Sequence, residues 1–113
     1  MAERTKIIIS TLAAGATDTT DIGPIPAGKK LTVKEFGAGG VIETDNKSSL
    51  YLLQWGVVGN FQDIRAITVT GTTVALPLMH EFLGDGVKFL RITRINPSIT
   101  SKRCPVWIVG FDQ

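Results

Sequence analysis

Residues 25–40, IPAGKKLTVKEFGAGG, decide how the chain is expected to fold, because they combine a strand-like run with a cluster of glycines. A glycine loop that holds a phosphate needs a strand before it and a helix N-terminus after it, since the free N–H groups of that helix bind the anion. The next residues, VIETDNKSS at 41–49, have no helical period and no Gly-Lys-Ser/Thr signature. We therefore expect the glycines of 37–40 to make a positive-φ turn between strands.

The strand inside this stretch is expected to contain a bulge. The apolar residues Leu31 and Val33 alternate with polar neighbours, which is typical of a strand with one buried face. Strict alternation would then turn Glu35 inward and Phe36 outward. A β-bulge at Lys34 and Glu35 would return the aromatic ring to the core.

The rest of the chain also favours strands over helices. Ile, Val and Thr make up 34 of the 113 residues, and these β-branched side chains suit a pleated surface. No segment keeps a 3.6-residue apolar period, whereas turn residues recur between short apolar runs. Besides 30–36, the expected strands are 6–12, 40–44, 50–58, 64–70, 73–78, 87–95 and 105–111.

This pattern predicts one all-β domain over residues 1–113: an antiparallel β-sandwich, jelly-roll-like, with about eight short strands. The composition of 13–21 and of 59–63 indicates loops. Gly71 is expected to turn a hairpin between its two neighbouring strands. Pro77 cannot donate to a β-ladder, so its strand is expected at an edge or to end there.

The strand at 50–58, LYLLQWGVV, is apolar on both faces. Tyr51, Leu53 and Trp55 share one face, while Leu50 and Leu52 occupy the other. Such a strand is covered on both sides or contributes to an interface. Arginine is enriched at interfaces because its planar head carries several donors. The candidate protein-interface residues are Leu50, Leu52, Trp55, Arg91 and Arg94.

Charge and composition argue against several functional classes. Twelve basic and ten acidic residues give a net charge of +2 with no block of like charge, so we expect no nucleic-acid partner. No apolar run reaches the roughly 18 to 20 residues that span a bilayer, so we expect no membrane insertion. With one cysteine, Cys104, and one histidine, His80, a metal site is improbable, and no cofactor motif is present.

Catalysis has no strong candidate in this sequence. His80 is followed by Glu81, but no serine has the setting of a nucleophile. Glu35 could face inward if the strand kept its alternation, although the bulge accounts for it more simply. We therefore expect a non-enzymatic protein. Trp55, Trp107 and Tyr51 leave open a sugar-binding platform, but their apolar strands favour a core or interface role.

Several stretches of the chain resemble the small jelly-roll decoration, or cement, proteins of tailed bacteriophage capsids. They are the strand entry IPAGKKLTV at 25–33, the turn and strand GDGVKFLRI at 84–92, the short Thr/Val/Ile-rich strands and the last strand near residue 113. The resemblance implies a structural virion protein made in the host cytoplasm. It would form a homotrimer on the capsid exterior, bind the major capsid protein and have no catalytic residues. The alternative is a carbohydrate- or receptor-binding β-sandwich module of a phage tail or fibre.

Overall fold

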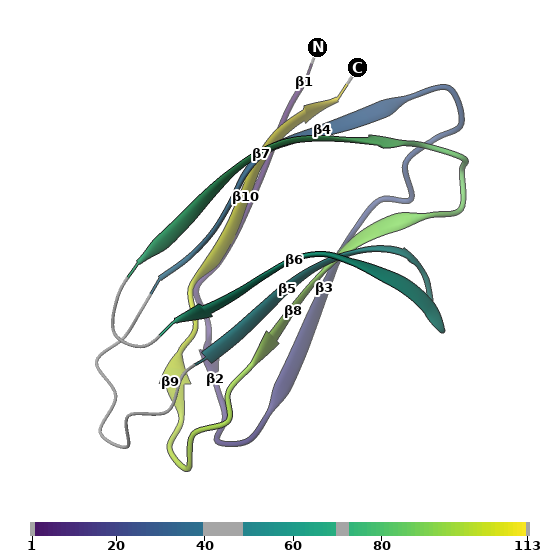
Figure 1. Ribbon diagram of the computed structural model, residues 1–113. Helices are drawn as coiled ribbons and strands as arrows, with labels where there is room; N and C mark the ends of the chain where they lie inside the picture. The colour runs from purple at the N-terminus through teal and green to yellow at the C-terminus, as the bar shows by residue number, and fades with distance from the viewer. Residues whose placement is uncertain (1, 40–48, 70–72, 113) are drawn as a thin grey trace.

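The computed structural model describes residues 2–39, 49–69 and 73–112, and within these residues it contains strands and no helix. Figure 1 shows the strands arranged in two layers. The strands are β1 (Ala2–Ile8), β2 (Thr11–Leu12), β3 (Thr17–Ile22), β4 (Lys30–Ala38), β5 (Ser49–Val57), β6 (Asn60–Val69), β7 (Val74–Leu83), β8 (Phe89–Ile95), β9 (Lys102–Arg103) and β10 (Val106–Asp112).

Two four-stranded antiparallel sheets make up the sandwich. Sheet A has the order β1-β10-β4-β7, and sheet C has the order β3-β8-β5-β6, while the short strands β2 and β9 pair with each other. When only the eight longer strands are counted in chain order, the two sheets read 1-8-3-6 and 2-7-4-5. This alternation between layers is that of a jelly roll built from two Greek keys. The predicted fold class is confirmed.

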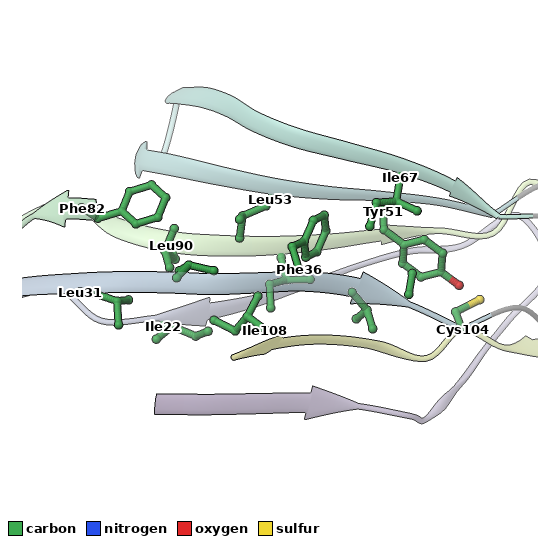
Figure 2. Packing of buried hydrophobic residues seen from close by; sticks show 14 of the residues in the cluster. Ile22, Leu31, Phe36, Tyr51, Leu53, Ile67, Phe82, Leu90, Cys104 and Ile108 are labelled. Atoms are coloured by element: carbon green, nitrogen blue, oxygen red, sulfur yellow. The ribbon is translucent and has the colours of Figure 1, made fainter. Parts of the chain in front are cut away.

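One hydrophobic core fills the space between the sheets. Its largest fully buried side chains come from both layers, with Phe36 and Phe82 from sheet A and Tyr51, Leu53 and Leu90 from sheet C. Figure 2 shows these side chains between the two sets of strands, and it places Cys104 near the Tyr51 ring. The inward faces of β4, β5, β8 and β10 therefore supply most of the apolar burial that holds the layers together.

The expected bulge in β4 is present. β10 aligns Glu35 and Val33 with two consecutive residues of its own, so Lys34 has no partner on that strand. The pairing with β7 shifts at the same place. Lys34 is exposed, and Phe36 is 0% exposed. Because the bulge leaves Lys34 out of the alternation, Phe36 returns to the core and Glu35 turns outward.

The positive-φ turn expected from the glycines of 37–40 is not present at Gly37. Gly37 lies inside β4 and is not among the positive-φ residues. A Cβ built on it would lie 2.2 Å from the Cζ2 atom of Trp107, so the glycine makes room for the indole. Gly40 and the expected strand at 40–44 lie outside the described residues.

Three other expectations are wrong or incomplete. The region 13–21, expected as a loop, contains most of β3, and 59–63 belongs mainly to β6, which follows a tight turn after β5. β6 and β7 do not form a hairpin, because β6 pairs with β5 in sheet C and β7 pairs with β4 in sheet A. Gly71 itself lies outside the described residues. Pro77 is on an edge strand, as predicted.

Candidate docking surface

The outward side of sheet A carries an apolar surface across its four strands. Val106 and Ile108 of β10 are buried, so the alternating residues Trp107, Val109 and Phe111 face away from the core. The residues that pair with these three on the neighbouring strands face the same way and extend this outward side over the sheet. We define the A face as the outward residues Ile7, Trp107, Val109, Phe111, Ala75 and Pro77, which surround Glu35.

Trp107 is held in one orientation at the centre of the A face. Its Nε1 donates a hydrogen bond of 2.8 Å to Oε2 of Glu35. The indole lies over Gly37, where a side chain would collide with the ring. The bulge at Lys34 is what turns the Glu35 carboxylate outward to meet the indole. Trp107 is therefore neither a core residue nor freely mobile: it is a half-buried ring anchored on the sheet.

The margins of the A face combine exposed apolar side chains with an ion pair. Ile7 is 63% exposed on the edge strand β1, and Met79 is 63% exposed on the edge strand β7. Glu81 of β7 is in the same cross-strand row as Phe111, through Thr32, and forms a salt bridge with Lys30 of β4. An apolar centre with a polar rim is the general layout of protein–protein interfaces.

The candidates Leu50 and Leu52 lie on the outward side of sheet C and are half-buried. Leu50 is opposite Ile95, and Leu52 is opposite Thr93, in the pairing of β5 with β8. Threonines 17, 19 and 68 flank this short apolar band on the outer strands. Leu50 and Leu52 thus lie on the face opposite Tyr51, as the sequence pattern indicated, and their role at an interface stays a prediction.

Arg91 lies further along the same side of sheet C, in a cluster of polar and aromatic groups. Its guanidinium forms two hydrogen bonds with Asp21, of 2.8 and 3.2 Å, and this contact raises the pKa of Arg91. The Arg91 Cζ atom also lies 4.5 Å from the centre of the Phe61 ring. Phe61 contacts Phe89 edge to face. Arg91 is thus accessible, but its charge is already paired.

Arg94, by contrast, has an internal role. The residue is 3% exposed, and its guanidinium donates to Asp18, to the backbone carbonyl oxygens of Ser10 and Cys104, and to the Ser10 hydroxyl. The strand alternation puts it on the inward side of β8, at the end where the sandwich is closed by the N-terminal segment. Arg94 is therefore removed from the candidate interface residues.

Trp55 also faces inward. Its ring contacts Phe82 with a centroid distance of 5.0 Å, at one end of the core. Trp55 therefore bridges sheet C and sheet A and does not join Leu50 and Leu52 on the outer side. The five candidate residues do not form one site, because Leu50, Leu52 and Arg91 lie on the outer side of sheet C, whereas Trp55 and Arg94 point between the layers.

The A face was missed by the sequence reasoning, although the signal was present. The run VWIVGF at 106–111 is apolar at both odd and even positions, as 50–58 is. A strand with two apolar faces in a two-layer fold must turn one of them outward. The same argument that selected Leu50 and Leu52 would have selected Val109 and Phe111.

No catalytic arrangement emerges from the described residues. His80 is exposed on β7 and contacts Phe82, with 4.5 Å between ring centres. Cys104 is buried, with its thiol 3.9 Å from the Ser49 hydroxyl. Burial, with the Cys104 thiol nearby, raises the pKa of Tyr51 above its ordinary value and keeps the phenol neutral. The described residues contain no group of three or more metal-ligating side chains, and no helix among them could cross a membrane.

Neither a known protein family nor a curated protein matches the sequence. Among solved structures, the crystal structure of PirA is similar in fold, with a TM-score of 0.51. The match has 17% sequence identity and covers 90% of this chain and 92% of that one. At this level of identity the likeness concerns the fold alone, and it agrees with the β-sandwich described above.

Proposed function

We propose that this chain is a non-catalytic structural protein that docks its A face onto neighbouring protein subunits. More specifically, we propose a capsid decoration protein that binds the major capsid protein on the outside of a bacteriophage capsid. The observation that supports this is the outward apolar row of Trp107, Val109 and Phe111, continued by Ile7 on β1. Contiguous apolar patches of this kind mark interaction sites more often than ordinary surface.

The size of the A face favours repeated contacts over a single tight one. Four strands about 4.8 Å apart, with five residues at about 3.4 Å each, cover roughly 300 Å². A stable pairwise interface takes about 800 Å² from each partner. One A face would therefore bind weakly, at roughly 25 cal/mol per Å² of apolar area. A homotrimer that presents several faces to a lattice would gain through multivalency, which is the arrangement we propose.

The test is co-sedimentation with capsids stripped of accessory proteins, combined with light scattering of the purified protein at micromolar concentration. Val109→Glu places a charge in the middle of the A face and is expected to abolish capsid binding. Thr68→Glu introduces the same charge at an exposed position of β6, on the other sheet, and is expected to bind as wild type does. A wild-type protein that stays monomeric and does not sediment with capsids would contradict the proposal.

A carbohydrate-binding module of a tail or fibre is the second candidate, and Trp107 is the observation that favours it. The indole lies over Gly37 and is fixed by Glu35, which is how a stacking platform for a sugar ring would be built. A glycan array separates the two candidates. Binding that is lost in Trp107→Ala and kept in Trp107→Phe would favour the sugar. An array with no binder would leave the decoration role as the proposal.

A further inference from the structure

The sandwich has four edge strands, and three of them carry features that block pairing with another chain. β7 contains Pro77 and a bulge at Met79, whose φ is 51°. β6 contains a bulge at Ile64, where its register with β5 shifts. β3 is short and carries Asp18 and Asp21. Proline, bulges, short length and charges are the usual means by which an edge is protected.

β1 has neither a proline nor a bulge, and two of its charged residues, Arg4 and Lys6, are basic, so they disfavour pairing with a like-charged strand but not with an acidic one. Its seven residues pair with β10 in one uninterrupted register, from Ala2 opposite Asp112 to Ile8 opposite Val106. In the described part of the chain no strand pairs with the other edge of β1. The backbone N–H and C=O groups along the free edge of β1 are therefore open to a further strand.

The side chains of β1 alternate between two different environments. Ile7 is opposite Trp107 and belongs to the A face, whereas Lys6 is opposite the buried Ile108 and lies on the inward row. Arg4 is on the same inward row. Both basic residues line a cavity of about 220 Å³ that opens between β1 and the end of β3, with Ile108 and Ile22 in its wall.

The charges around this cavity are not balanced. Arg4 is paired with Asp112, and Asp21, which also lines the cavity, is paired with Arg91. No ion pair holds Lys6 among the described side chains. The inward row of an added strand would pass over the cavity and meet Lys6 and Arg4. An acidic side chain at those positions would be favoured by the excess positive charge.

We propose that the free edge of β1 accepts an extended segment of a partner protein in which acidic residues alternate with apolar or β-branched ones. The segment adds a fifth strand to sheet A. Its acidic side chains enter the cavity beside Lys6 and Arg4, and its apolar side chains continue the A face beside Ile7. Main-chain hydrogen bonds supply the affinity, and the alternate side chains supply the selectivity.

A second copy of this chain fits the edge less well. Suppose that β1 of one copy pairs antiparallel with β1 of a second copy about a two-fold axis. Opposite side chains then share a face, so the two residue numbers of each opposite pair are both even or both odd. The three registers that pair five or more residues place Arg4 opposite Arg4, Arg4 opposite Lys6, or Lys6 opposite Lys6. Like charges directly opposite each other are destabilising. The edge therefore favours a different, acidic partner.

An NMR titration of the labelled, full-length protein tests this inference. The probe is a capped peptide, Thr-Val-Glu-Val-Glu-Val-Thr, and the control peptide has lysine at both glutamate positions. The acidic peptide is expected to shift the backbone amides of residues 2–8 most strongly. It is expected to bind about fivefold more tightly than the basic peptide, because two cross-strand charge pairs are reversed. Methylation of alternate peptide nitrogens should abolish the shifts.

Two charge reversals complete the experiment. Lys6→Glu is expected to invert the preference, so that the basic peptide binds more tightly. Lys34→Glu makes the same change on an exposed residue of β4, away from the edge, and should leave the preference as in wild type. Equal binding of the two peptides, shifts centred on β3, β6 or β7, or dimerisation through β1 without peptide would each overturn the inference. None of these results depends on capsid binding by the A face.

Discussion

The indole Nε1 of Trp107 donates a hydrogen bond of 2.8 Å to the Glu35 carboxylate, across the pairing of β10 with β4. This contact fixes an aromatic ring on the outward side of the sheet. A side chain that is already ordered loses less conformational entropy on binding, so the contact would lower the free-energy cost of the docking proposed above. The arrangement depends on Gly37 below the ring and on the bulge beside Glu35.

Gly37→Ala is expected to displace the Trp107 indole, because the new Cβ would lie 2.2 Å from a ring atom. Overpacking of this kind costs about 1–3 kcal/mol of folding free energy. Tryptophan fluorescence and thermal unfolding measure both effects, and we expect a red-shifted emission and a lower Tm. Glu35→Gln is the control, because its amide oxygen still accepts the indole N–H. Wild-type emission and Tm in Gly37→Ala would contradict the described packing.

Deletion of Lys34 should be tolerated better than deletion of Thr32 from the same strand. Without Lys34 the bulge is lost, but Val33, Glu35 and Phe36 then follow regular alternation, so Phe36 stays in the core. Without Thr32, Leu31 and Val33 become neighbours, and one of these two side chains of 0% exposure must turn outward, at a cost of about 2–5 kcal/mol. Urea denaturation of the two variants compares their free energies of unfolding. Equal losses of stability would mean that the bulge does not explain the position of Phe36.

Arg94→Ala is expected to destabilise the fold by about 1–3 kcal/mol, because it leaves hydrogen-bond acceptors in the protein interior without their donor. The change leaves Asp18 and two backbone carbonyl groups without their donor. Asp18→Asn, which keeps an oxygen acceptor at a partly exposed position, should cost less. Arg91→Ala is the matched control, since Arg91 pairs with Asp21 on the outer side. A loss in Arg91→Ala as large as that in Arg94→Ala would refute the distinction.

Because Tyr51 is buried, we expect the free energy of unfolding to fall in alkaline solution. Burial raises its pKa in the folded state above the ordinary value of about 10, so the unfolded chain loses the phenolic proton first. Above about pH 10 the unfolded state therefore binds fewer protons, and the free energy of unfolding falls as the pH rises. Tyr51→Phe should remove this part of the pH dependence between roughly pH 10 and 11. Parallel pH profiles of unfolding for both proteins would contradict the prediction.

The apolar pattern predicted the core strands well, and the polar edges poorly. β4, β5, β8 and β10 have buried faces that appear directly in the sequence as apolar alternation or apolar runs. β3, with the sequence TDTTDI, contains β-branched residues but only one apolar side chain and two aspartates, which are rare in strands. It pairs with β8 along its whole length, and Asp18 forms an ion pair with Arg94, a residue far away in the chain. A local pattern contains no information about such a partner.

A local sequence pattern also does not indicate which of the two sheets each of two consecutive strands joins. β6 and β7 look like the two arms of a hairpin, but each pairs with an earlier strand in a different layer. Likewise, an apolar strand does not indicate which of its two faces meets the opposite sheet. Trp107 and Trp55 have similar settings in the sequence, yet one is on the outer side of sheet A and the other packs on Phe82.

β10 lies between β1 and β4, so a central strand of sheet A is the last of the domain's strands to leave the ribosome (Figure 1). Until β10 emerges, β1 has no strand to pair with in the part of the chain that the structure describes. The pairing of β1 with β10 then closes a loop of nearly the whole domain, which is a slow kind of step. Sheet A is therefore complete only once β10 has emerged, and chaperones that shield extended apolar segments would act on nascent chains before that point.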